Sequence, residues 1–483
     1  MHADADEIAA LVARPIGGDA PARAVQVIDE RRRAVPVGYA TIWRRCSMAY
    51  AVRTRLHVPA RTLVPEEPTM QVVPVRYDDL EREELLRVAH DSMLFGMVVN
   101  RAMLPQVVLH SGSLDALNDV AIDLWMGASP VYTHRMRKLM GIEGDDVAAI
   151  MKALQLDVGF VHQYMDVVYE VLDDRHADFR LNHCGALLDA EPHGEAHVFG
   201  MCHTIEDPTF DATAYATNPR ARIRPVHRPP RVPPDRHPHC HWTITIDPDN
   251  EPVGPARLTE QVARLPLASV PNRRRGDDDG DDGGGGMSDY RGRFRPTFRL
   301  RDLTDATLAA VAREFDVQVN LLVCSGHLAL LERFPDAATE IVVSAWVGSA
   351  WIQSERLARS IVAADLADRV ARVLALHPGV PPGLARTVEV DGDRVRATLT
   401  EDTAGVLDPN HPGWPGLLAA GETRGVDAIV HAIDPTAHVE VALCGRELVV
   451  DVAVGAGDPV PEPPEVPLVR IGRVAGWEFD PAR

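Results

Sequence analysis

Apolar residues recur with a helical period in the second half of the chain. They are spaced three or four residues apart, which places them on one face of a helix. The positions are Leu308, Val311, Ala312, Phe315, Val319 and Leu322. We therefore predict a helical region at residues 308–322.

Two hairpins are predicted after these helices. Residues 387–399 alternate apolar and polar side chains on both sides of Asp391-Gly392, a pair typical of tight β-turns. Residues 437–443 and 446–454 repeat this pattern around Cys444-Gly445. Helices followed by antiparallel hairpins predict an α+β fold in which helices pack on a sheet.

The first half of the chain repeats the pattern of the second. Leu85 and Leu308 lie 223 residues apart, and Arg135 and Arg356 lie 221 apart. Further matches continue in the same order while the offset decreases in small steps. Self-similarity in a fixed order indicates an internal duplication. Because Arg135 and Arg356 recur, we expect them to be partners in structural ion pairs.

An Asp- and Gly-rich segment separates the two predicted copies. Residues 273–290 include a run of aspartates and four consecutive glycines, a composition too polar to fold on its own. We predict that this segment is a disordered, flexible linker. The first copy then covers residues 80–272 and the second covers 291–483, while residues 1–79 form an N-terminal extension.

The composition limits the classes of function. The chain has 483 residues and a formal net charge of −20, which repels nucleic-acid phosphates, so we expect no nucleic-acid partner. The N-terminus lacks the features of a signal peptide, and no stretch of about 18 apolar residues occurs. We therefore expect a cytoplasmic protein without membrane contact, of undetermined oligomeric state. The motifs of P-loop, dinucleotide-binding, serine-hydrolase and zincin enzymes are absent.

Three of the six cysteines are close together in the first copy, and each is next to a histidine. We predict that residues 186–190 and 196–200 form a hairpin, which would place Cys184 and Cys202 opposite each other. Cys240 lies in the second strand of a further hairpin with a proline-rich loop. The neighbouring histidines are His183, His203, His239 and His241.

These residue types point to metal chemistry. Thiolate and imidazole are the preferred ligands of zinc, and thiolates also hold iron–sulfur clusters. We predict a zinc or iron site formed by Cys184, Cys202 and Cys240, with a histidine or water as the remaining ligand. The candidate histidine ligands are His183, His239 and His241. Two alternatives stay open: a metal-free catalytic thiol activated by a histidine, and buried cysteines without a chemical role.

The second copy has no equivalent of the three thiols. Their aligned positions lie at or near Thr403, Leu418 and Leu448. A fold that needed a metal for stability would need it in both copies. We therefore expect the cluster to be functional and the second copy to be a scaffold or a pocket wall.

Charged residues near the cluster are candidates for catalysis and binding. Glu206 is a candidate general acid or base, and His203 is a candidate proton shuttle. Asp207 is expected to cap a helix that begins at Pro208, and it is a further catalytic candidate. A basic stretch follows, either as a solvated loop or as a site for an anionic group of the substrate. Its candidate binding residues are Arg222, Arg224 and Arg228.

Residues 179–207 are predicted to run as a strand, Cys184, a turn, a second strand, Cys202 and then acidic residues that end at Asp207. This order resembles the bacterial family of L-2-amino-thiazoline-4-carboxylic acid hydrolase-like proteins. The resemblance implies that Cys184, Cys202 and Asp207 are site residues. It also implies hydrolysis of a small carboxylated heterocycle or amide. That family is single-copy and lacks the segment His239-Cys240-His241.

The sequence therefore predicts a metal-dependent enzyme, a hydrolase of a small carboxylated heterocycle or amide, with a zinc or iron site in the first copy. One alternative is an iron–sulfur redox or sensor protein. Others are a metal-free cysteine enzyme and a binding protein without catalytic activity.

Overall fold

The computed structural model describes residues 71–73, 76–272 and 285–470. Residues 1–70 of the predicted extension, Cys46 among them, and residues 273–284 of the predicted linker lie outside the described residues. Residues 76–272 are called the first half, and residues 285–470 are called the second half.

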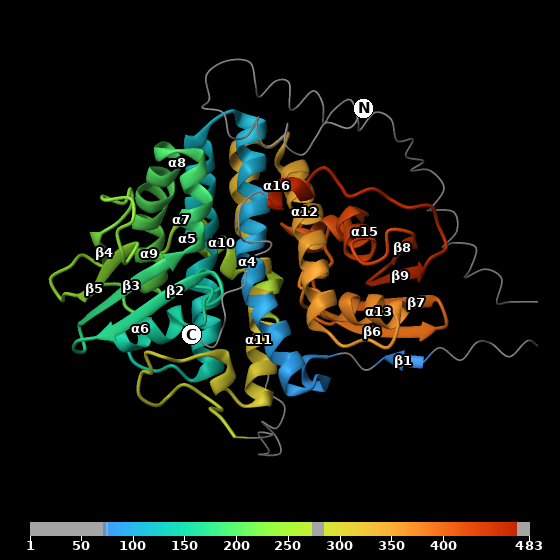
Figure 1. The fold of residues 1–483 in the computed structure, drawn as a ribbon, viewed down its shortest axis with the longest axis horizontal. Coiled ribbons are helices and arrows are strands. Elements are labelled where there is room, and N and C mark those ends of the chain that lie inside the picture. The colour runs from blue at the N-terminus through green and yellow to red at the C-terminus, as the bar shows by residue number, and fades with distance from the viewer. Residues whose placement is uncertain (1–70, 74–75, 273–284, 471–483) are drawn as a thin grey trace, which may run out of the picture.

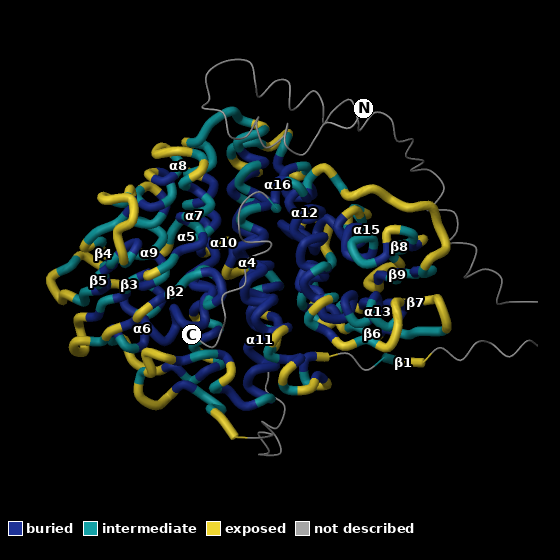
Figure 2. Tube along the Cα trace, in the orientation of Figure 1, coloured by how far each residue is buried: buried dark blue, intermediate teal, exposed yellow. Residues whose placement is uncertain are grey.

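Four long helices form the centre of the molecule. They are α4 (Arg82–Ser111), α5 (Leu114–Met140), α11 (Asp305–Arg333) and α12 (Ala338–Ser360). Helix α4 packs against both α11 and α12, and α5 packs against α11, so the two halves share one interior. Figure 2 shows α4, α11 and α12 as mostly buried, as expected where apolar side chains are removed from water between neighbouring helices.

Two antiparallel sheets lie on opposite sides of the helices (Figure 1). The sheet of the first half has the order β2-β3-β5-β4 and contains β2 (Met165–Val171), β3 (His176–Cys184), β5 (Cys240–Ile246) and β4 (Ala221–His227). The sheet of the second half has the order β1-β6-β7-β9-β8. Its strands are β1 (Gln71–Val73), β6 (Leu384–Asp391), β7 (Arg394–Glu401), β9 (Glu447–Ala453) and β8 (His438–Cys444).

Shorter helices connect these elements. In the first half they are η1 (Tyr77–Asp79), α6 (Val147–Leu154), α7 (Gly185–Ala190), η2 (Glu191–His193), α8 (Glu195–Phe199), the π-helix η3 (Gly200–Ile205), α9 (Glu206–Tyr215), α10 (Arg257–Ala263) and η4 (Pro266–Ser269). In the second half they are η5 (Leu300–Asp302), α13 (Leu366–Leu376), α14 (Trp414–Ala419), α15 (Arg424–His431) and α16 (Val466–Arg470).

The structure is a mixture of helices and antiparallel sheets, which confirms the α+β fold class. The hairpins predicted at residues 387–399 and 437–454 are β6–β7 and β8–β9, with turns at Gly392 and Gly445, where φ is 59° and 68°. Each half runs through a helix pair, a short helix, a hairpin, further short helices and a second hairpin.

The hairpin predicted at residues 186–190 and 196–200 is wrong, because this region is helical from α7 to η3. The buried residues Leu187 and Ala190, and then Val198, Cys202 and Ile205, are three or four positions apart. This spacing is that of a helix. A helix therefore buries these apolar side chains against the core, whereas a strand would direct some of them to the opposite face.

The helix that contains Asp207 also differs from the prediction. Helix α9 begins at Glu206 and continues directly from the π-helix η3, so Asp207 lies inside its first turn instead of capping it. Asp207 accepts a hydrogen bond from Arg228.

The C-terminal part of the predicted linker is packed against the protein. The Met287 N–H donates to the Asp302 carbonyl at 2.7 Å. Tyr290 is fully buried, and its hydroxyl donates to Gln155 Oε1 at 2.8 Å. The packed region of the second half therefore begins before residue 291.

Among the described residues, α4 is the one helix that is long and apolar enough to cross a membrane. In its most apolar stretch, 72% of the residues are buried inside the protein.

Candidate functional site

A cavity of about 710 Å³ lies between the helix pair α4–α5 and the layer formed by the sheet and helices α7 to α9 of the first half, and Leu468 of α16 in the second half also lines it. Its volume is in the range of small-molecule sites. Most of its wall is apolar, and the larger apolar side chains include Leu104, Leu117, Trp125, Phe160, Phe210 and Trp242. Gly194, Glu195 and Ala196 line it and are exposed, so the cavity reaches the surface beside α8.

Glu206 reaches this cavity because of an irregular helix. It is the first residue of α9 and directly follows the π-helix η3. Single π-helical turns widen a helix and are frequent at functional sites. Gly200, at the start of η3, packs closely against α5, since a Cβ atom there would lie 2.7 Å from Asn118 Oδ1. The glycine thus lets η3 approach α5 and fixes the position of the residues that follow.

The Glu206 carboxyl lines the cavity without a direct partner. Within the described part of the chain it makes no hydrogen bond or ion pair. Burial raises its pKa to about 8, although the nearby guanidinium of Arg228 lowers it and the Asp207 carboxylate raises it. Desolvation disfavours the charged form of a carboxyl, so Glu206 is mostly protonated near neutral pH.

A second acid lies at another part of the wall. Asp157 is buried, and its Oδ1 accepts the Tyr132 hydroxyl at 2.9 Å and the Gly159 N–H at 2.6 Å. Burial raises the pKa of Asp157 to about 6 even though these two hydrogen bonds lower it. The cavity is therefore lined by two carboxyl groups that titrate close to neutral pH.

A third acid on the wall is neutralised by a cation. Asp189 of α7 forms an ion pair with Arg101 of α4, and its Oδ2 accepts the Tyr164 hydroxyl at 2.9 Å. This contact links α4 to α7 across the cavity. The other carboxylate oxygen, Oδ1, is buried and has no hydrogen-bond partner.

The three cysteines of the predicted metal site do come together. Cys184, Cys202 and Cys240 are all buried in one apolar cluster, and Cys202 interacts electrostatically with both of the others. Burial and the charge of Glu206 raise all three thiol pKa values, that of Cys184 to about 12. A nucleophilic thiol needs the opposite shift. Among the described residues, no group of three or more Cys, His, Asp or Glu side chains is arranged to hold a metal ion.

None of the four predicted site histidines is among the described residues that line the cavity. Each of them has contacts elsewhere. His203 Nε2 lies 2.7 Å from the Pro229 carbonyl oxygen, and His241 Nε2 lies 2.9 Å from Asp178 Oδ2. The rings of His183 and His239 are 5.5 Å apart. Burial lowers the pKa of His239 to about 4. These histidines lie around the end of the sheet that carries Cys240.

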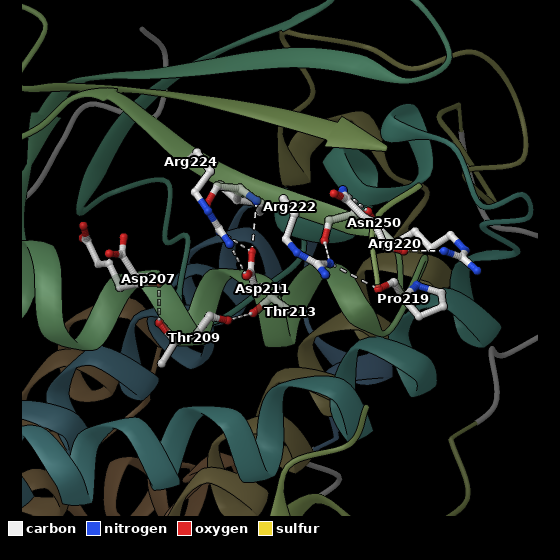
Figure 3. Close-up of polar contacts among 12 residues, drawn as sticks. Asp207, Thr209, Asp211, Thr213, Pro219, Arg220, Arg222, Arg224 and Asn250 are labelled. Carbon is white, nitrogen blue, oxygen red and sulfur yellow. Dashed lines mark hydrogen bonds and ion pairs between the residues drawn. The ribbon is translucent and has the colours of Figure 1, made fainter. Parts of the chain in front are cut away.

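Each of the three arginines predicted to bind an anion has protein acceptors in the structure. Figure 3 shows Arg224 directed at Asp211, and its two amino groups donate to the carboxylate at 2.7 and 2.8 Å. Arg222 donates to the carbonyls of Ala221 and Pro219, and Arg228 forms an ion pair with Asp207. Arg224 of β4 and Arg228, which directly follows β4, pair with carboxylates of α9, whereas Arg222 donates to backbone carbonyls outside α9, and none of the three lines the cavity.

Sequence reasoning named Glu206 as a candidate, and the structure places it in the cavity wall, but that reasoning did not point to Asp157, Asp189 or the cavity itself. One signal was present: Asp157 lies between Leu156 and Val158 in an apolar stretch, which is unusual for an exposed acid. Asp189 carried no comparable signal, because its partner Arg101 is 88 positions away.

No protein-family model, curated protein or solved structure matches this chain.

Proposed function

We propose that the first half of the chain is a small-molecule site, most simply an acid–base enzyme, which binds a largely apolar molecule in the cavity and in which Glu206 is the group that gains or loses a proton. The observation that carries the proposal is the Glu206 carboxyl itself, which lines an apolar cavity, has no direct partner among the described residues and has a pKa of about 8.

The chemistry of such a group supports this function. A general acid or base works best when its pKa lies near the operating pH, because both protonation states are then accessible. An apolar environment disfavours the charged form of a carboxyl. The stability of the rest of the fold must therefore offset the cost of holding the carboxyl there. Buried acids with raised pKa values inside cavities are therefore candidates for functional groups.

The metal-dependent hydrolase predicted from the cysteines stays a prediction. The positions of the arginines favour a different substrate from the carboxylated one implied by the family resemblance. Arg222, Arg224 and Arg228 are engaged by protein acceptors, and the one arginine in the described cavity wall, Arg101, is paired with Asp189. An anionic substrate would therefore have to displace an existing partner.

We also infer that the two halves are copies of one ancestral unit. The shared order of helices and hairpins and the shared strand order, β2-β3-β5-β4 and β6-β7-β9-β8, support this. A single duplication explains both because each half repeats the same connections.

The second half supports the assignment of the site to the first. Cys324 and His327, which are 223 residues after Arg101 and Leu104, bind the backbone of Pro412 and Gly413. Trp414 follows and stacks on Trp346 at 5.7 Å, whereas Trp125, the counterpart of Trp346, lines the cavity. The space that is open in the first half is thus filled by the chain's own residues in the second.

The binding part of the proposal is tested with a cavity-blocking variant. Leu117 lines the cavity, and Leu117→Trp would fill part of it. Leu331→Trp, at a residue of α11 that is 41% exposed, is the matched control. We expect ligand-observed NMR with a fragment library to detect fragments that bind the wild type and the control but not Leu117→Trp. If every bound fragment also bound the blocked variant, the cavity would not be the site.

The proton-exchange part is tested by calorimetry of a bound fragment in buffers of different ionisation enthalpy. We expect proton uptake or release on binding to the wild type and none in Glu206→Gln. Proton exchange of equal size in both proteins would exclude Glu206 as the responsible group.

A further inference from the structure

The charges on the cavity wall are unequal. The acids in the wall are Asp157, Asp189, Glu195 and Glu206, and the bases are Arg101, His193 and His197. Arg101 is paired with Asp189, and burial lowers the pKa of both histidines, which disfavours their positive charge at neutral pH. The described wall therefore offers three carboxyl groups that no cation in the wall neutralises: Asp157, Glu206 and the exposed Glu195.

Aromatic rings lie beside one of these carboxyls. Phe210 is one helical turn after Glu206 on α9, so the two side chains lie on the same face of the helix. Phe210 packs edge-to-face against Trp242 at 4.7 Å and lies 5.7 Å from Phe160, and all three rings line the cavity. Ring faces attract cations through their quadrupole, and the attraction strengthens when water is excluded.

One cation already uses this group of rings. The Arg228 guanidinium lies 5.8 Å from the centre of the Trp242 ring, although Arg228 is not part of the described cavity wall. The groups that interact electrostatically with Glu206 are Asp207, which follows it on α9, and from other segments Arg228 and the thiols of Cys184, Cys202 and Cys240. Only Arg228 among them is a cation, and the ion pair with Asp207 partly neutralises it.

We propose that the ligand of this cavity is a hydrophobic cation, an amine or quaternary ammonium with an aromatic or alkyl body, whose charge lies between the Glu206 carboxylate and the rings of Phe210 and Trp242. This inference rests on the proposed function, because it names the class of molecule that the same cavity takes. Binding of such a cation ionises Glu206 and releases its proton to solvent. The opposite charges then compensate each other inside a largely apolar cavity.

The test compares a cation with a neutral molecule of the same shape. Benzyltrimethylammonium carries a fixed charge, and neopentylbenzene replaces its nitrogen with carbon. Binding of both to the full chain is measured by NMR titration in the wild type and in Glu206→Gln. The control is Glu260→Gln, since Glu260 is exposed on α10 and pairs with Arg264. We expect the cation to bind the wild type and the control about tenfold more tightly than its isostere. In Glu206→Gln we expect this preference to disappear.

A second variant separates loss of the charge site from loss of the fold. Phe210→Leu keeps an apolar side chain but removes a ring face, so it should weaken binding of the cation more than binding of the isostere. Equal affinities in the wild type, or a preference that persists in Glu206→Gln, would overturn the inference. Failure of the cation to bind while other fragments bind would overturn it too. The proposed function is judged by a separate result. It stands if Leu117→Trp prevents the binding of fragments, and it fails if every fragment still binds this variant.

Discussion

Arg135 of α5 and Glu314 of α11 form a two-point ion pair that joins the first half of the chain to the second, with N–O distances of 2.6 and 2.9 Å. Arg356 of α12 and Asp91 of α4 form a second pair, with Arg356 Nε 2.9 Å from Asp91 Oδ1. Arg356 is 221 residues after Arg135, and Glu314 is 223 residues after Asp91. The pairs therefore occupy matching positions in opposite halves, and the arginines are structural partners as predicted.

Removal of one partner of the Arg135–Glu314 ion pair should strongly destabilise the protein. Glu314 is almost fully buried, so Glu314→Ala would leave the Arg135 guanidinium inside the bundle without its counter-charge. We expect the free energy of unfolding to fall by about 3–5 kcal/mol. Urea denaturation measures this loss. Glu260→Ala, which removes an exposed i,i+4 pair with Arg264, should change stability by about 0–1 kcal/mol. Similar small effects for both variants would contradict a structural role of the buried pair.

The pH dependence of stability should report on Glu206. Its pKa is raised by burial to about 8 from an ordinary value of 4.5. Between these values the unfolded chain ionises while the folded protein keeps its proton, so the contribution of Glu206 to stability falls as pH rises and is constant above about pH 8. Glu206→Gln lacks this fall, and we expect it to be more stable than the wild type by about 1–3 kcal/mol at pH 8.

Denaturation midpoints of the wild type and Glu206→Gln at pH 5, 6.5 and 8 test this expectation, with Glu260→Gln as control. The stability difference should grow with pH only for Glu206→Gln. A constant difference across this range would mean that Glu206 ionises in the folded protein much as it does in the unfolded chain.

The three clustered thiols should react slowly. Because Cys184, Cys202 and Cys240 are buried and their pKa values are raised, little thiolate is present near neutral pH. In a Cys46→Ser, Cys444→Ser background, we expect iodoacetamide to modify the folded protein about a hundredfold more slowly than the unfolded chain. Rapid modification of one of the three would favour the metal-free cysteine enzyme. About one zinc or iron per chain, lost in Cys184→Ser, would favour the metal-dependent hydrolase.

Changes in side-chain volume should have effects of unequal size in the two halves. Trp414 is fully buried against Trp346, so Trp414→Ala should lower stability by about 3–5 kcal/mol through the lost contacts and the space left behind. Leu117→Trp adds volume where the first half is already open, and we expect a change below about 1.5 kcal/mol. Thermal unfolding monitored by circular dichroism measures both. A large loss of stability in Leu117→Trp would mean that the cavity is closed in solution.

The sequence predicted the fold class because helical and hairpin patterns are local. The turn at Asp391-Gly392 and the periodic apolar residues of α11 each depend on neighbours a few positions away. Residues 186–200 were misassigned because short apolar runs fit a strand or a helix, and burial against α5 and the sheet decides between them.

The site was predictable only in part for a similar reason. Glu206 was named as a candidate from its place after the cysteines, and the three cysteines do gather. The cavity depends on how α4, α5 and the sheet pack, which no local pattern records. The roles of Arg222 and Arg224 depend on acceptors elsewhere in the chain, such as Asp211 and the Glu251 carbonyl.

The proposed role of Glu206 is tested most directly by a titration of its carboxyl by ¹³C NMR in the full chain, with the signal assigned by its absence in Glu206→Gln. We expect a midpoint near pH 8, because burial in the apolar cavity disfavours the charge. We also expect saturating benzyltrimethylammonium to lower this midpoint. A midpoint below about pH 5 in the empty protein would show an ordinary solvated carboxylate and would contradict the proposed site.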